Sequence, residues 1–166
     1  MNKRVIKTDK SGESFEIGRC DAADLSLLLE MYSNFSPKPA SQGLPPPDNE
    51  TCHNWVIKLF EMGMNFLAWK NGKVIAHTAL IPDPKEKAVE FIVFVDQNYR
   101  NLRIGTELTW STLEEAKALG FQSVWLSVET SNFVAIKLYR NFGFQFFDMD
   151  SCERIMLLKF SRKNLR

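Results

Sequence analysis

The chain has 166 residues, of which 45% are hydrophobic and 25% are charged. This composition excludes a disordered or fibrous chain, and the length is too short for two ordinary domains, so we expect one globular domain with a hydrophobic core. The 21 Lys and Arg nearly balance the 20 Asp and Glu. No overall field therefore favours nucleic acid or an anionic membrane, and we expect neither as a partner.

Residues 15–20 predict a first strand, and Asp21 offers a helix cap before a helix with Leu25, Leu28, Leu29 and Tyr32 on its apolar positions. The proline-rich segment 36–48 predicts an extended loop, because proline removes N–H donors and restrains the preceding residue. A second helix is expected from residue 49 to near Gly63.

The middle of the chain predicts an antiparallel meander. Residues 65–69 are expected to form a strand that the hairpin pair Asn71 and Gly72 joins to a strand over 74–81. A second connection then leads to a strand over 89–95. Three successive strands with short links pair antiparallel.

The second half predicts a parallel crossover, so the sheet should be mixed. Its expected elements are a helix over 104–119 ended by Gly120, a strand over 123–128, a helix over 132–142 ended by Gly143, and strands over 145–149 and 155–160. No internal repeat is visible.

The most informative segment is the strand VEFIVFV, the turn DQNY and then RNLRIGT, which opens the long helix. A strand that feeds through a short basic turn into a helix leaves backbone N–H groups unpaired at the positive end of the helix dipole. This arrangement predicts a seat for an anion, most simply phosphate. The alternative is a solvated basic helix start with no ligand.

The string YRNLRIGTEL, the strand VWLSVE, and then Asn132, Ala135, Tyr139 and Gly143 with Phe144 resemble the GNAT superfamily of N-acetyltransferases. The resemblance implies a mixed α/β fold, in which about four helices flank a mostly antiparallel sheet with one splayed parallel pair. It implies acetyl-CoA as co-substrate, with its pyrophosphate bound by the turn. We expect no metal, because His53 and His77 lack metal-ligand spacing.

The resemblance implies that the splayed strand pairs with pantetheine, that the turn binds the diphosphate, and that Asn132, Ala135 and Tyr139 face the pantetheine arm from one side of their helix. The cofactor-binding residues predicted in this way are Val93, Phe94, Val95, Arg100, Asn101, Leu102, Arg103, Ile104, Gly105, Thr106, Asn132, Ala135 and Tyr139.

One position departs from the family pattern of Gln or Arg, two variable residues, Gly, one variable residue, and Gly or Ala. Arg100 and Gly105 fit the pattern, but Arg103 stands at the first glycine position. We expect Arg103 to adopt a helical backbone, to present its N–H, and to add a charged contact to phosphate. The alternative is that its side chain blocks the seat.

Two residues are the candidate catalytic groups. Glu90 is the predicted general base, because a carboxylate on an otherwise apolar strand can have a raised pKa. The resemblance implies that Tyr139 protonates the departing thiolate, and that a bulge at Phe94 or Val95 supplies a backbone N–H for the oxyanion. The alternatives are a solvent-exposed strand-end glutamate and a half-buried packing tyrosine.

The resemblance places the acceptor site on the first helices, the loop between them and the late strands, and predicts Glu30 and Tyr32 as substrate-binding residues together with segments 36–48 and 148–153. The expected reaction moves acetyl to a primary amine of a small molecule or protein; the alternative is a catalytically weak CoA-binding regulatory module. Exposed apolar residues of the last strands could mediate a homodimer, although the sequence does not require one.

Cys20, Cys52 and Cys152 are an odd number without metal-ligand spacing, as expected for reduced thiols. Residues 1–14 lack the apolar segment of a signal peptide, and no later apolar run approaches bilayer length. We therefore expect a soluble cytoplasmic protein with a flexible segment over 1–14, a single domain over 15–161 and a basic tail over 162–166.

Overall fold

The computed structural model describes residues 3–37, 45–147 and 153–161 of the chain. Its elements are β1 (Val5–Thr8), β2 (Ser14–Arg19), η1 (Ala22–Asp24), α1 (Leu25–Ser33), α2 (Asn49–Met62), β3 (Met64–Lys70), β4 (Lys73–Pro82), β5 (Ala88–Val95), η2 (Gln97–Tyr99), α3 (Ile104–Ala118), β6 (Ser123–Glu129), α4 (Phe133–Asn141), β7 (Gln145–Phe146) and β8 (Glu153–Lys159). No helix in these ranges combines the length and the apolar composition that a membrane crossing requires.

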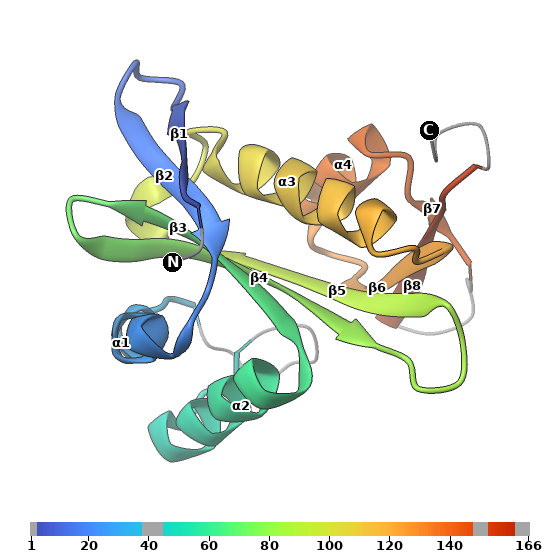
Figure 1. The fold of residues 1–166 in the computed structure, drawn as a ribbon, viewed down its shortest axis with the longest axis horizontal. Helices are drawn as coiled ribbons and strands as arrows, with labels where there is room; N and C mark the ends of the chain where they lie inside the picture. Colours follow the sequence, from blue (N-terminus) through green and yellow to red (C-terminus); the bar gives the residue numbers. More distant parts are fainter. Residues whose placement is uncertain (1–2, 38–44, 148–152, 162–166) are drawn as a thin grey trace.

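The strands form one sheet in the order β1-β2-β3-β4-β5-β6-β8-β7. All neighbours run antiparallel except β5 and β6, which run parallel. Helices α3 and α4 cover one face of the sheet, and α1 and α2 cover part of the other (Figure 1). This arrangement confirms the mixed α/β fold class predicted from the sequence.

Local signals position most elements as expected. The Asp21 side chain caps η1 by accepting a hydrogen bond from Ala23 N–H at 2.9 Å, and α1 follows at once. The Asn71 and Gly72 hairpin has the predicted positive φ angles of 51° and 75°. Gly120 and Gly143 are also left-handed, at 85° and 93°, as expected for residues that end helices.

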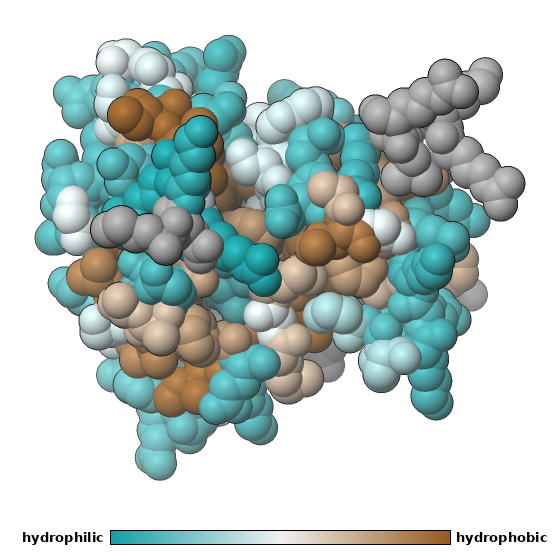
Figure 2. Space-filling model, in the orientation of Figure 1, coloured by the Kyte–Doolittle hydropathy of each residue, from teal (hydrophilic) through white to brown (hydrophobic). Residues whose placement is uncertain are grey.

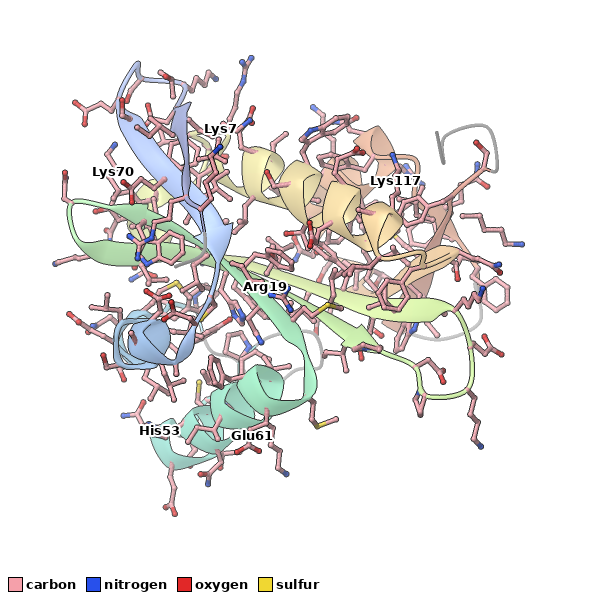
Figure 3. The ribbon with its side chains drawn as sticks, in the orientation of Figure 1. Lys7, Arg19, His53, Glu61, Lys70 and Lys117 are labelled. Carbon is pink, nitrogen blue, oxygen red and sulfur yellow. The ribbon has the colours of Figure 1, made fainter. Side chains whose placement is uncertain are left out.

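The N-terminal segment differs from the prediction. Val5–Thr8 forms an edge strand that pairs with β2, and Lys7 Nζ lies 3.1 Å from Glu107 Oε2 of α3 (Figure 3). The buried Asp9 carboxylate closes the β1–β2 turn by accepting from Ser11 N–H at 2.8 Å and from Lys70 Nζ at 2.9 Å. Residues 5–8 therefore form a strand of the sheet, and 9–13 form the turn that leads into β2, whereas the sequence predicted a flexible segment over 1–14. The basic tail 162–166 lies outside the described residues.

The two faces of the sheet bury separate hydrophobic cores. The core beneath α3 and α4 contains Val89 and Phe91 of β5, with Val93 and Val95 packed against it. The core beneath α1 and α2 contains Phe94, with Ile92 packed against it. Residues of β5 thus alternate between the two cores, as the period of a strand requires. Figure 2 shows further apolar surface over the β1–β2 end of the sheet, where Val5 and Ile6 are exposed.

The parallel pair splays apart after a short contact. Strands β5 and β6 pair only at Ala88↔Ser123, Val89↔Val124 and Glu90↔Trp125. Beyond Trp125, β6 remains paired with β8 as far as Glu129, while residues 91–95 of β5 pair with no described strand other than β4. A gap therefore opens between β5 and β6, with Glu90 at its apex, and the predicted splayed pair is confirmed.

Candidate active site

Glu90 is the last residue of β5 that pairs with β6. The alternation along β5 places its side chain with Ile92 and Phe94, on the face that carries α1 and α2. The side chain is half-buried, and burial raises the pKa of its carboxyl above the ordinary value. Half-burial argues against a freely solvated strand-end glutamate and fits a group that accepts a proton.

The backbone of β5 offers unpaired groups to the gap. Asp96 N–H donates to Ile75 O of β4 at 2.9 Å, and backbone groups along a strand point alternately to its two sides. The N–H groups of Val93 and Val95 therefore point away from β4 into the gap, and that of Phe94 points toward its register partner His77. This assigns the gap-facing backbone to Val93 and Val95 rather than to Phe94.

The predicted bulge at Phe94 or Val95 is not present. Each residue from Val89 to Val95 has one partner on β4, with no register shift along the pair. The strand needs no bulge to expose N–H groups, because the divergence of β6 already leaves that edge of β5 unpaired.

The turn between β5 and α3 is held by polar contacts of its own. Asp96 Oδ1 accepts from Asn98 N–H at 2.8 Å and so caps η2. Asn101 has a left-handed backbone with a φ of 62°, which asparagine tolerates better than most residues. Leu102 O accepts from Lys10 N–H at 3.0 Å, so the β1–β2 hairpin supports the turn from the side.

Four consecutive backbone N–H groups at the start of α3, those of Arg103, Ile104, Gly105 and Thr106, have no acceptor among the described residues. The first bond onto the helix is made by Glu107 N–H, which donates to Arg103 O at 3.0 Å. The positive end of the helix dipole adds to these free donors. Together they can hold an anion, and the diphosphate of acetyl-CoA stays a prediction.

The backbone of Arg103 differs from the prediction. The sequence predicted a helical conformation, but Arg103 is the left-handed N-cap of α3, with a φ of 66° and a ψ of 5°. A non-glycine residue in this region costs roughly 1–2 kcal/mol, because its Cβ lies too close to the following carbonyl oxygen. The glycine of the family pattern therefore suits this position for its backbone. The Arg103 side chain is exposed and has no polar partner among the described residues.

Gly105 allows the start of α3 to approach the end of β5. A Cβ added at Gly105 would lie 3.1 Å from Val95 Cγ2, which is closer than an ordinary contact. A larger residue would therefore push the free N–H groups away from the gap, which explains why this position of the pattern requires a small residue.

The Arg100 side chain is bound to protein carbonyls rather than left free for phosphate. Its Nε donates to Val95 O at 3.1 Å and its Nη2 donates to Ser36 O at 2.7 Å. The Gln97 side chain also contacts this segment: it accepts from Ser36 N–H at 3.0 Å and donates to Asn34 O at 2.7 Å. The sequence analysis missed Gln97, because its partners lie 61 and 63 residues earlier and no local spacing marks them.

Asn132 begins α4. Its Oδ1 accepts from Ala135 N–H at 3.2 Å and caps the helix. This leaves the amide nitrogen of the exposed Asn132 side chain as the group able to meet pantetheine. Ala135 is half-buried on the same face of the helix.

Tyr139 lies one helical turn beyond Ala135 and is buried. Its ring packs against Phe91 of β5 and Phe144, with ring centres 6.4 Å and 5.8 Å away. Burial raises the pKa of its hydroxyl, which therefore stays protonated at neutral pH. That hydroxyl makes no hydrogen bond with any described residue. Tyr139 and Glu90 therefore lie on opposite faces of the sheet, Tyr139 against Phe91 and Glu90 at the last paired position of β5.

The predicted acceptor residue Tyr32 is instead part of the core. It is 1% exposed, and its hydroxyl lies 2.7 Å from His77 Nδ1. His77 Nε2 in turn lies 2.8 Å from Asn65 Oδ1. Asn65 Nδ2 donates to Leu59 O, so Asn65 Oδ1 is an acceptor, His77 Nε2 carries the proton, and Tyr32 donates to Nδ1. The hydroxyl of Tyr32 is thus already used within the core, which argues against an acceptor-binding role.

The other acceptor residues are only partly described. Glu30 is exposed on α1 and stays a prediction. Segments 38–44 and 148–152, within the two predicted loop regions, lie outside the described residues, as does the side chain of Glu153. The part of the chain that the structure describes contains no group of three His, Cys, Asp or Glu placed to hold a metal.

Trp125 of β6 lies beside Glu90, although the sequence analysis did not single it out. It is the register partner of Glu90, so its half-buried side chain lies beside that carboxyl on the same face. Helices α1 and α2 pack on β3 and β4, and no described helix covers this face of β6 and β8 (Figure 1). The pairing across β5 and β6 could not be read from sequence spacing, so only the fold reveals this neighbour.

Comparisons with known proteins agree with this geometry. The GNAT domain of S. lividans PAT superimposes with a TM-score of 0.82 at 14% identity, covering 95% of this chain and 97% of that one. The acetyltransferase yncA from Salmonella typhimurium, whose structure contains acetyl-CoA, gives a TM-score of 0.69 at 18% identity, covering 89% and 95%. At these identities the likeness shows the fold.

Comparison of the sequence with known proteins shows the family as well as the fold. The [ribosomal protein bS18]-alanine N-acetyltransferase of Escherichia coli K12 is 33% identical over 95 residues, which span 54% of this chain and 64% of that protein. The Acetyltransferase (GNAT) family matches residues 28–144, which include β5, the free N–H groups of α3, and α4. This chain is therefore a member of the GNAT family of acetyltransferases.

Proposed function

We propose that this protein transfers the acetyl group of acetyl-CoA to a primary amine of a small molecule or protein, by direct attack of the amine within a ternary complex. One observation carries this proposal: the free N–H groups at the start of α3 adjoin the gap between β5 and β6. An anion seat beside an unpaired strand edge fits a ligand with a diphosphate and an amide-bearing arm, which is the chemistry of coenzyme A.

The roles within the site follow from these positions. The N–H groups of residues 103–106 would hold the diphosphate. The gap-facing backbone of Val93 and Val95 would pair with the pantetheine amides, with Asn132 and Ala135 on the α4 side. The thioester then lies at the gap, where Glu90 and Tyr139 reach it from the two faces of the sheet.

The reaction needs a neutral amine. A lysine-like amine has a pKa of about 10.4, so its deprotonation at pH 7 costs about 4–5 kcal/mol. Glu90, with its raised pKa, would accept that proton directly or through water. The amine lone pair then attacks the thioester carbon, and a gap-facing N–H of β5 binds the oxyanion. Collapse breaks the C–S bond, and Tyr139 gives its proton to the thiolate. The nitrogen, which is cationic after the attack, loses its extra proton through water, and that proton restores the Tyr139 hydroxyl.

Positioning should contribute more than proton transfer. Holding amine and thioester together is worth roughly 7–11 kcal/mol, against about 3–5.5 kcal/mol for acid and base assistance. We therefore expect Glu90→Gln to slow acetyl transfer without abolishing it, with a larger loss below pH 8 than above it. A pH–rate profile of both proteins checks this. A profile for the variant that overlays the wild type from pH 6 to 9 would remove Glu90 from the mechanism.

The proposal is tested by a screen of primary amines. Release of free thiol from acetyl-CoA is followed with small amines, polyamines, lysine peptides and peptides with free N-termini, and the product is identified by mass spectrometry. Amine-dependent thiol release with an acetylated product supports the enzyme. The absence of heat on titration with coenzyme A, together with no turnover, would refute it.

A second candidate function rests on Arg103. Its left-handed backbone and its large side chain stand where the family pattern has glycine, and a degraded seat would suit a CoA-responsive regulatory module that has lost turnover. Thermal stabilisation by coenzyme A without thiol release on the whole panel would favour that module over the enzyme.

A further inference from the structure

The side chains of Gln97 and Arg100 join the end of α1 to the turn that precedes α3. Ser36 N–H donates to Gln97 Oε1 at 3.0 Å, and Gln97 Nε2 donates to Asn34 O at 2.7 Å. Arg100 Nη2 donates to Ser36 O at 2.7 Å. These three hydrogen bonds form a latch between two segments that are about sixty residues apart in the sequence.

Arg100 has further contacts that orient it for this task. Its Nε donates to Val95 O at 3.1 Å, and its guanidinium lies 5.2 Å from the centre of the Phe35 ring. Phe35 in turn packs edge-on against Phe94 of β5, with the two ring centres 5.7 Å apart. A planar guanidinium can bind two carbonyls on separate segments in fixed directions, whereas an ammonium group lacks that geometry.

Helix α1 does not need the latch in order to end. Asn34 uses its backbone N–H and its side-chain Nδ2 to donate to Glu30 O, at 3.3 Å and 3.1 Å. Phe35 N–H donates to Tyr32 O at 3.3 Å. These local bonds already end the helix at the carbonyls of Glu30 and Tyr32, so the latch adds a connection between segments and not a helix cap.

The two joined segments serve the two substrates of the proposed reaction. Three residues beyond Arg100 lie the free N–H groups proposed to hold the cofactor diphosphate. Ser36 lies in the connection from α1 to α2, the two helices on the face where Glu90 and Trp125 lie. If a ligand makes the turn before α3 more rigid, the hydrogen bonds of Gln97 and Arg100 would therefore also make residues 34–36 more rigid on the acceptor side.

We propose that Gln97 and Arg100 are positioning residues that couple cofactor binding at the α3 turn to the placement of residues 34–36 on the acceptor side. The inference rests on the proposed function, because it takes coenzyme A as the ligand of the turn. Arg100 acts in it through Ser36, and not as a ligand of phosphate.

Amide exchange of Ser36 tests the coupling directly, because this N–H is part of the latch. The exchange rate of the Ser36 amide is measured by NMR with and without saturating coenzyme A, in the wild type, Gln97→Ala and Arg100→Lys. Coenzyme A should slow exchange about fivefold or more in the wild type and leave it unchanged in both variants. Calorimetry should show that both variants bind coenzyme A within about threefold of the wild type.

Two matched controls lie away from the latch. Arg19→Lys (Figure 3) and Gln122→Ala change exposed side chains that have no hydrogen bond to residues 34–36, and they should keep the wild-type response. With the best amine from the screen, the latch variants should raise the acceptor KM about tenfold with little change in coenzyme affinity.

The outcomes separate the two proposals. Wild-type protein that binds coenzyme A with no change at Ser36 refutes the latch alone. A loss of coenzyme affinity of about tenfold or more in Arg100→Lys, but not in Gln97→Ala, makes Arg100 a phosphate ligand and also refutes it. Wild-type protein that binds no coenzyme A refutes the proposed function, and the latch with it.

Discussion

Two tyrosines, Tyr32 on α1 and Tyr139 on α4, are buried on opposite faces of the same sheet. Burial raises the pKa of both hydroxyls, so each stays protonated. The Tyr32 hydroxyl donates a hydrogen bond to His77, which in turn donates to Asn65. The Tyr139 hydroxyl has no polar partner among the described residues, and its ring packs against Phe91, the first residue of β5 beyond the pairing with β6. Burial and a raised pKa are therefore shared by a structural and a candidate catalytic tyrosine, and the partner of the hydroxyl distinguishes them.

The largest expected effect is on the rate of acetyl transfer, which should depend on the hydroxyl of Tyr139 and not on that of Tyr32. Tyr139→Phe should lower the rate of acetyl transfer about 100-fold or more, because the departing thiolate loses its proton donor. Its stability should change little, since the hydroxyl has no partner to lose. Steady-state rates with the best amine and urea unfolding measure both quantities. A rate close to that of the wild type would make Tyr139 a packing residue like Tyr32.

The dependence of stability on pH tests the hydrogen-bonded chain of Tyr32, His77 and Asn65. Burial lowers the pKa of His77 to about 3, below the ordinary value of 6.5, so the folded state favours the neutral ring. The unfolded state binds the extra proton, and stability should therefore be complete above pH 6.5 and fall by about 1.4 kcal/mol per pH unit below it. Urea unfolding at pH 7, 6 and 5 measures this slope, because these pH values lie above those at which most carboxyl groups take up protons.

The second histidine provides the control for that slope. His53 is exposed on α2, so His53→Ala should keep the loss of stability between pH 7 and 5. Equal stability of the wild type at these three pH values would show that His77 is able to take up a proton in the folded protein.

A smaller effect is expected from the other hydroxyl. Tyr32→Phe leaves His77 Nδ1 buried without a donor, and this should cost about 1–3 kcal/mol of stability. Acetyl transfer per folded molecule should stay at the wild-type level, the reverse of the expected result for Tyr139→Phe. A large loss of turnover in Tyr32→Phe at full stability would return Tyr32 to the acceptor site.

The smallest expected effect concerns stability and Arg103, the N-cap residue of α3. Arg103→Gly should raise stability by about 0.5–1 kcal/mol, because relief of the left-handed strain exceeds the entropy that glycine adds to the unfolded chain. Arg103→Ala keeps the strain and removes the charge, so it is the matched control. If the guanidinium meets the diphosphate, both variants should lose the same salt-dependent part of the coenzyme affinity. Equal stability of the Gly and Ala variants would contradict the strain.

The elements that the sequence predicted well carry their signal within a few residues. The Asn71 and Gly72 hairpin and the glycines that end α3 and α4 are local, and the strand, turn and helix around residue 103 follow from spacing. Strand β1 was missed because it has four residues, all exposed or half-buried, and therefore no alternation to detect.

The site was predictable in its local parts and not in its long-range ones. Free N–H groups follow from any helix start, and Glu90 follows from the strand pattern. The contact between Tyr32 and His77 could not be read from the sequence, because the two residues lie 45 positions apart. The left-handed backbone of Arg103 could not be read either, because the sequence has no glycine there to indicate it. The neighbours Glu90 and Trp125 meet only when β5 and β6 pair.

The first hairpin has a practical consequence for work on this protein. Lys10 N–H donates to Leu102 O and Lys7 pairs with Glu107, so the β1–β2 hairpin supports the turn before α3 and the first turn of that helix from outside the family-matched region. Removing these residues to aid crystallisation, or attaching an affinity tag to them, would disturb the proposed coenzyme site, and the resulting loss of binding would be easily mistaken for an inactive enzyme.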